Sequence, residues 1–169
     1  SSFGSIIING FEYAFKMMAG PKATDELCGN YFSSLLIQRA KYAVTLDASG
    51  GGIIASNVFA SVIFDAVSGA ADGITLIDTG VNVDNKFLSV HAYRRTLLSG
   101  KTLWIKAGVY NTYVMGYLGE STYILDSGND NMIINLDAPS LGYGQTKIIK
   151  KTVNYNDSSP VKCTDVWDG

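Results

Sequence analysis

The chain has 169 residues, with 13 Lys and Arg against 15 Asp and Glu, so its formal net charge is −2. This balance excludes a globally basic domain of the kind that binds nucleic acid or anionic membranes. Charged residues make up only 17% of the chain, against about 25% in typical soluble domains. Because a subunit that buries surface against its neighbours needs less charge than a monomer, the composition favours assembly.

The length fits one domain over residues 1–169, large enough to bury a core without metals or disulfides. Residues 1–8 are predicted to form either a first strand or an extended arm that pairs with a neighbouring copy. The residues expected to carry that self-assembly are Ile6, Ile7 and Ile8. A short helix is predicted over 10–19, because Asn9 offers an N-cap and Glu12 follows three residues later.

The next segment, 25–44, is predicted to be a long helix, since apolar residues recur at intervals of three or four after the N-cap Thr24. A glycine-rich loop follows at 47–52. The apolar run 53–64 is too short to span a bilayer and indicates a helix buried in the core.

Residues 74–77 are predicted to form a short strand, and 86–99 a helix that ends at Gly100. A strand remains an alternative for 87–93. The stretch 101–137 carries most of the β-signal, because apolar residues alternate with polar ones between turn-forming clusters. We expect an antiparallel β-meander there.

A last strand is predicted over 147–155, where lysines suit a sheet edge, and 156–169 is predicted to be a polar tail. No internal repeat is evident in this interpretation. Helices first and strands later is the α+β pattern, so the predicted fold is N-terminal helices packed on a C-terminal, mainly antiparallel meander.

Catalytic and metal motifs are not found. His91 is the one histidine, which excludes metal sites and mechanisms that need two, and no motif marks a nucleophile. Cys28 and Cys163 have no metal-binding spacing, and free thiols are favoured over a bridge between them. We therefore predict no catalytic residues, no metal and no cofactor.

Two weaker signals each have an ordinary structural explanation. The turn containing Asp126, Asn129, Asp130 and Asn131 offers oxygen ligands for calcium, but it lacks the EF-hand pattern, so a plain turn is favoured. Basic residues near aromatic ones could contact single-stranded nucleic acid, but the chain is acidic overall, and its pI of about 5.2 disfavours this partner. The residues concerned are Arg94, Arg95, Lys101, Lys106, Lys147, Lys150 and Lys151.

Tyrosines dominate the predicted meander, beside small hydrogen-bonding residues. Large amphipathic rings of this kind suit recognition of a sugar or a protein, although they also pack well across strands. The candidate binding residues are Tyr110, Tyr113, Tyr117, Tyr123 and Trp104.

The function predicted first is a non-enzymatic, self-assembling structural subunit, such as a virus or phage particle protein or an extracellular filament subunit. Its partners would be further copies or other structural proteins, and a virion or extracellular location is favoured over the cytoplasm. The alternative is a secreted adhesin that binds a ligand or carbohydrate through the tyrosine-rich strands. The third is a hydrolase whose carboxylates no sequence spacing identifies.

Overall fold

The computed structural model describes residues 1–66, 72–77, 81–93, 100–118, 124–136 and 147–150. These residues form β-strands and no helix, arranged in three sheets. Sheet A contains β1 (Ser2–Asn9), β4 (Tyr31–Ala40), β7 (Val58–Phe59), β8 (Val62–Ala66), β11 (Lys86–Tyr93), β14 (Tyr113–Tyr117), β16 (Met132–Asn135) and β17 (Lys147–Lys150). Sheet B contains β2 (Tyr13–Met18), β5 (Tyr42–Asp47), β9 (Asp72–Ile77), β12 (Leu103–Ile105) and β15 (Ile124–Asp126). Sheet C contains β3 (Glu26–Cys28), β6 (Ile53–Ala55), β10 (Val81–Val83) and β13 (Val109–Tyr110).

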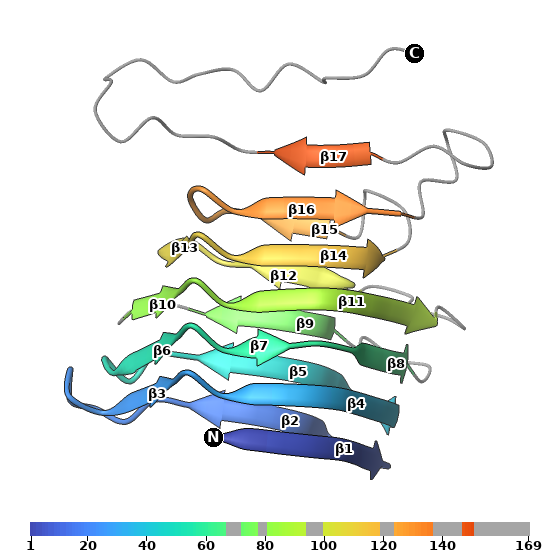
Figure 1. The fold of residues 1–169 in the computed structure, drawn as a ribbon, viewed down its shortest axis with the longest axis horizontal. Coiled ribbons are helices and arrows are strands. Elements are labelled where there is room, and N and C mark those ends of the chain that lie inside the picture. The colour runs from blue at the N-terminus through green and yellow to red at the C-terminus, as the bar shows by residue number, and fades with distance from the viewer. Residues whose placement is uncertain (67–71, 78–80, 94–99, 119–123, 137–146, 151–169) are drawn as a thin grey trace.

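The architecture is a parallel β-solenoid. The chain passes from sheet B to sheet C to sheet A and then begins the next coil, so that strands of successive coils stack in parallel (Figure 1). Sheet A runs in the order β1-β4-β7-β11-β14-β16-β17, with β8 continuing the β7 level between β4 and β11. The predicted α+β fold is therefore wrong.

Each segment that was predicted to form a helix contains β-strands in the structure. The 10–19 segment contains β2, the 25–44 segment contains β3, β4 and the first half of β5, and the 53–64 segment contains β6, β7 and most of β8. The 86–99 segment begins with β11, so the strand alternative for 87–93 is confirmed.

The helical spacing has a specific cause in β4. Its buried residues are Phe32, Leu35, Ile37 and Ala40, so the steps between them are three, two and three residues. A regular strand would give steps of two throughout. The register shifts between Gln38 and Ala40, where an extra residue is inserted, and such insertions imitate the three-to-four spacing of a helix.

The predicted antiparallel meander is also wrong. Consecutive strands from β12 to β16 lie in different sheets, and each pairs in parallel with a strand of the neighbouring coil. The alternation in the sequence was correct for strands, but it carries no information on their partners. The exception is β17, which pairs antiparallel with β16 and lies at the edge of sheet A, as predicted for its lysine-containing sequence.

A column of aromatic rings runs along sheet A, buried from Phe32 onward, with the half-exposed ring of Phe3 at its N-terminal end. Phe3, Phe32, Phe59 and Phe87 stack with centroid distances of 4.7, 4.8 and 4.6 Å. Val114 and Ile133 continue the column in register, and both are fully buried. Equivalent positions of successive coils therefore carry similar side chains, which is what a parallel stack with constant spacing requires.

The turn from sheet C to sheet A repeats in every coil. Its first residue has a left-handed backbone, with φ of 50–65°, a conformation tolerated by glycine and by short polar residues. These residues are Gly29, Ser56, Asp84, Asn111 and Asp130. The next position carries Asn30, Asn57, Asn85, Thr112 and Asn131, of which the last four are buried.

The buried asparagines join neighbouring coils. The side-chain oxygen of Asn57 accepts hydrogen bonds from the backbone and side-chain nitrogens of Asn30, at 3.1 and 2.9 Å. Its Nδ2 donates to Leu27 O at 2.8 Å and to Asn85 Oδ1 at 3.0 Å. The polar groups that the turn removes from water are thereby satisfied inside the protein.

The chain thus contains an internal repeat, contrary to our prediction. Register partners Tyr31, Val58, Lys86, Tyr113 and Met132 follow one another by 27, 28, 27 and 19 residues. The shortening of the last coil keeps the stack in register but makes the repeat irregular in sequence.

Candidate functional site

The largest sheet presents a broad outward surface, which we call the outer face of sheet A. It consists of three columns of side chains that project away from the core, as their register and partial exposure indicate. The first column is Tyr31, Val58, Lys86, Tyr113 and Met132; the middle column is Ser5, Ser34, Ser61, Ser89, Met115 and Ile134; the third is Ile7, Leu36, Ile63, His91 and Tyr117.

Large apolar or aromatic side chains on this face remain in contact with solvent. Ile7 is 71% exposed, Tyr117 49% and Tyr31 43%, and Leu88 beside the middle column is also exposed. A surface of this kind, when continuous over neighbouring strands, is typical of an interaction site.

The C-terminal half of the face is ordered by contacts among its own side chains. The hydroxyl of Tyr113 donates to the sulfur of Met115 at 3.4 Å. The rings of His91 and Tyr117 lie 5.4 Å apart with an interplanar angle of 39°. These contacts hold the tyrosine rings in place and reduce the entropy that they would lose on binding.

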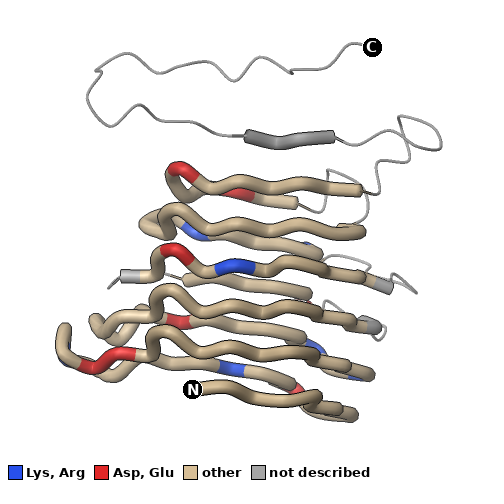
Figure 2. Tube along the Cα trace, in the orientation of Figure 1, with Lys and Arg blue, Asp and Glu red and all other residues tan. Residues whose placement is uncertain are grey.

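The outer face is poor in charge. Lys86 is the one charged residue in the three columns as the described side chains define them, and its ammonium lies 3.6 Å from Asp84 in the preceding turn. Figure 2 shows few charged positions along the strands of sheet A from β1 to β16. Lys86 lies at the start of the middle strand, β11. An uncharged surface on this scale is costly to leave in water and favourable to cover.

The outer face of sheet B has a different character. Tyr13 and Tyr42 stack at 4.6 Å, and Lys16 and Lys41 lie over these rings at 4.9 and 5.4 Å. Lys41 also bonds Glu12 at 3.2 Å, and that hydrogen bond raises the pKa of Lys41. Here the aromatic rings already have cationic partners within the chain.

Asp47 is a further ionised group beside this face. Partial burial raises its pKa, but hydrogen bonds from Ser49 and the nearby charge of Lys16, at 3.7 Å, outweigh the burial, so the net pKa is lowered. The carboxylate is thereby kept ionised at the end of β5, where it accepts a hydrogen bond from the loop that follows.

The predicted binding residues do not form one cluster. Tyr113 and Tyr117 lie on the outer face of sheet A, whereas Trp104 lies on sheet B, where Lys106 stacks on it at 4.4 Å. Tyr110 is 40% exposed at the end of β13 in sheet C. Tyr123 lies outside the described residues.

The three isoleucines of the N-terminus are also divided. In β1, Ile6 and Ile8 pack against the core, and only Ile7 projects onto the outer face. β1 pairs in parallel with β4 as the first strand of sheet A. The predicted tail at 156–169 lies outside the described residues.

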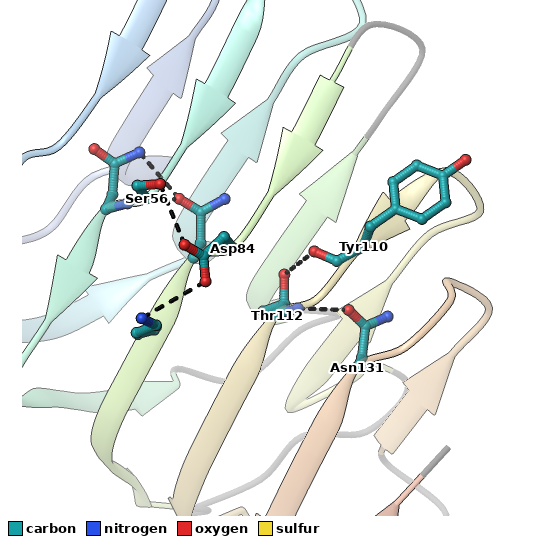
Figure 3. A network of polar contacts seen from close by, with 8 residues as sticks. Ser56, Asp84, Tyr110, Thr112 and Asn131 are labelled. Atoms are coloured by element: carbon teal, nitrogen blue, oxygen red, sulfur yellow. Dashed lines mark hydrogen bonds and ion pairs between the residues drawn. The ribbon is translucent and has the colours of Figure 1, made fainter. Parts of the chain in front are cut away.

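The corner between sheets C and A carries a polar network with a structural role (Figure 3). The hydroxyl of Ser56 donates to Asp84, and the backbone N–H of Thr112 donates to Asn131 Oδ1 at 2.9 Å. In the turn proposed for calcium, Asp126 Oδ1 accepts from the backbone of Gly128 and the side chain of Asn131. This carboxylate oxygen therefore stabilises the turn by accepting hydrogen bonds. In the described part of the chain, no group of three or more His, Cys, Asp or Glu side chains could hold a metal ion.

The remaining chemical candidates are dispersed. His91 is half-buried on β11, beside Tyr117, and Cys28 is a half-buried free thiol at the end of β3. Cys163, Arg94 and Arg95 lie outside the described residues. Within the described ranges there is no helix long and apolar enough to cross a membrane.

Sequence reasoning missed half of the outer face. The helices predicted over 25–44 and 53–64 included Tyr31, Leu36, Val58 and Ile63 among the apolar residues to be buried. In the structure these four residues alternate with the buried residues of β4, β7 and β8. The signal that identifies them is the repeated tetrapeptide at the corner. It reads GNYF at 29–32, SNVF at 56–59 and DNKF at 84–87, and it fixes which residues are inside and which are outside in each coil.

Comparisons with protein-family models, with curated proteins and with solved structures give no match for this chain.

Proposed function

We propose that the chain is a non-enzymatic structural subunit that self-assembles through the outer face of sheet A. The observation that carries this proposal is the face itself: from β1 to β16 its three columns consist of apolar, aromatic and small hydroxyl side chains with one lysine, Lys86, among the side chains that the structure describes. A virus or phage particle protein or an extracellular filament subunit is the setting in which such a rigid stacked unit is most useful.

Self-association is favoured by the distribution of charge. Among the described residues, the ion pairs Lys16–Asp47 and Lys41–Glu12 lie at sheet B and its turns, while the three columns of sheet A carry one ion pair, Lys86–Asp84. A second copy of the chain offers a surface with the same apolar character. Lys86 lies in the first column, at one side of the contact, so the middle column brings no charged group into the centre of the interface.

The area is sufficient for a specific contact. Six strand spacings from β1 to β17 give about 29 Å at about 4.8 Å each, and the five residue steps from Tyr31 to Leu36 give about 17 Å. Two such faces in contact would bury about 1,000 Å² in total, at the lower limit for a specific interface. We therefore expect association that depends on concentration.

The test is light scattering of the purified full chain over a range of concentrations, with two matched charge variants. Tyr117→Glu places a carboxylate on the outer face of sheet A, and it is expected to convert the oligomer to a monomer. Leu125→Glu places the same group on sheet B, where Leu125 is 39% exposed, and it is expected to leave the oligomer unchanged. A wild-type chain that remains monomeric at high concentration would contradict the proposed self-assembly.

A second candidate, an adhesin that binds carbohydrate, is favoured by the exposure of the tyrosine rings. Tyr31 and Tyr117 each leave more than two fifths of their surface open to solvent, and sugar rings stack on such surfaces. A glycan array with the wild-type chain and Tyr117→Ala tests it: binding that the substitution removes supports the adhesin, and no binding to any glycan counts against it.

A further inference from the structure

We infer that two copies pack their sheet A outer faces together with antiparallel solenoid axes, so that β11 of one copy lies across β11 of the other. This inference rests on the proposed self-assembly and specifies its geometry. A two-fold contact of this type is closed, and it buries the same patch of each copy.

Two arrangements bring the faces together about a two-fold axis. If that axis runs parallel to the strands, the order of strands is reversed in the second copy, and β11 meets β11 because it is the middle strand of sheet A. If the axis runs along the solenoid, each strand meets the same strand of the second copy. The two arrangements therefore differ in which coils oppose each other.

Side-chain size changes along the face. The middle column has serine at its first four positions, Ser5, Ser34, Ser61 and Ser89, and then Met115 and Ile134. In the first column, Val58 of β7 occupies the position that Tyr113 occupies in β14. In the third column, Ile63 of β8 occupies the position that Tyr117 occupies in β14. The middle column is thus built from shorter side chains in its N-terminal half than in its C-terminal half, and β7 and β8 carry shorter side chains than β14 in the outer columns.

The antiparallel arrangement sets long side chains against short ones. Met115 then faces Ser61, Ile134 faces Ser34, and Tyr113 faces Val58 of the second copy. The exception is Tyr31, which faces Met132 at the side of the contact. With parallel axes, the tyrosine rows meet each other and the serine rows also meet, which leaves crowding at one end and a gap at the other. Packed interfaces reach the density of protein interiors, so this misfit is unfavourable.

Charge opposes the antiparallel arrangement only weakly. It places Lys86 opposite Lys86 and Asp84 opposite Asp84, but the Lys86 side chain is 47% exposed and its ammonium is already paired with Asp84 at 3.6 Å. Water and salt weaken the repulsion between such exposed charges, whereas they do not restore the packing contacts that are lost at a gap between apolar side chains. The fit of side chains therefore decides the orientation.

Thiol cross-linking tests the arrangement in a Cys28→Ser, Cys163→Ser background of the full chain. Faced sheets lie about 10 Å apart, so a bifunctional maleimide that spans about 10 Å is the probe. In the antiparallel dimer Ser34→Cys and Ile134→Cys lie about 10 Å apart across the interface, and each lies about 22 Å from its own counterpart. We expect a mixture of these two variants to cross-link and each variant alone to fail.

Ser89→Cys serves as the internal reference, because it lies close to the axis in either arrangement and should cross-link with itself. If Ile134→Cys alone cross-links as efficiently as the mixture, the axes are parallel and the inference is overturned while self-assembly stands. If Ser89→Cys does not cross-link in a chain that scatters as a dimer, this face is not the interface. A monomer in all variants and in the wild type would instead overturn the proposed function.

Discussion

Replacement of Asn57 by alanine tests whether the buried asparagines hold the coils together. Asn57 is fully buried, and its side chain makes hydrogen bonds with Asn30, Leu27 and Asn85 at 2.8–3.1 Å. In Asn57→Ala, the carbonyl of Leu27 and the backbone N–H of Asn30 lose these partners. Asn85 Oδ1 keeps the backbone nitrogen of residue 57 as a donor at 3.2 Å.

The expected loss of stability follows from the two backbone groups that are left without these hydrogen-bond partners. A buried polar group without a partner costs about 1–3 kcal/mol, so Asn57→Ala should lower the free energy of unfolding by about 2–5 kcal/mol. The measurement is urea unfolding followed by far-ultraviolet circular dichroism, at protein concentrations held equal. Asn57→Thr should lose less, because Thr112 occupies the equivalent position of a later coil.

The matched control is Asn129→Ala. Asn129 is exposed, and its removal should change the free energy of unfolding by less than about 0.5 kcal/mol. If Asn57→Ala were as mild as this control, the asparagine contacts would be incidental to stability and the argument for a hydrogen-bonded stack of turns would be refuted.

Three further substitutions test the core, the strand register and the pH dependence. Phe59→Ala removes a fully buried ring stacked on both sides, and it should cost about 4 kcal/mol in urea unfolding. Gly116→Ala should cost about 2–3 kcal/mol by the same assay, because an added Cβ would contact the backbone nitrogen of Val90 at 2.5 Å; an unchanged midpoint would contradict that crowding. The lowered pKa of Asp47 means that its carboxylate stabilises the fold above pH 3.8, the ordinary value, and that this contribution is lost as the pH falls through the lower folded-state pKa. The stability difference between wild type and Asp47→Asn should therefore shrink on acidification below pH 3.8; a difference that grows would contradict the assignment.

The sequence allowed some elements to be predicted and not others. The strand at 74–77, the glycine-rich loop at 47–52 and the edge position of β17 are confirmed, because each depends on local residue chemistry. The helices failed because the steps of three and two between Phe32, Leu35 and Ile37 resemble helical spacing. The β-branched content of β6, β7 and β8 was the contrary signal, since Ile53, Ile54 and Val58 favour strands.

The parallel pairing was beyond the reach of the alternation pattern alone. Alternation indicates that one side of a strand is buried, but the partner of each strand is set by coil length, which here varies between 19 and 28 residues at Tyr31, Val58, Lys86, Tyr113 and Met132. The corner tetrapeptide occurs once in each coil, so the distance between its copies in the sequence gives the coil length. Its left-handed residue must be short or flexible and the residue after it must satisfy buried backbone groups, so both positions are restricted by physical need.

Once the corner is aligned, the candidate interaction surface follows from the register. Tyr31 and Tyr113 are 82 positions apart in sequence, yet they occupy one column because each stands immediately before a residue of the buried column that begins with Phe32. Composition indicated a surface poor in charge, but only the stacking of coils gathers those uncharged residues on a single sheet while Lys16, Lys41 and Glu12 lie elsewhere. The proposed assembly depends on this segregation, since the same residues scattered over all three sheets would leave each face with enough charge to remain in water.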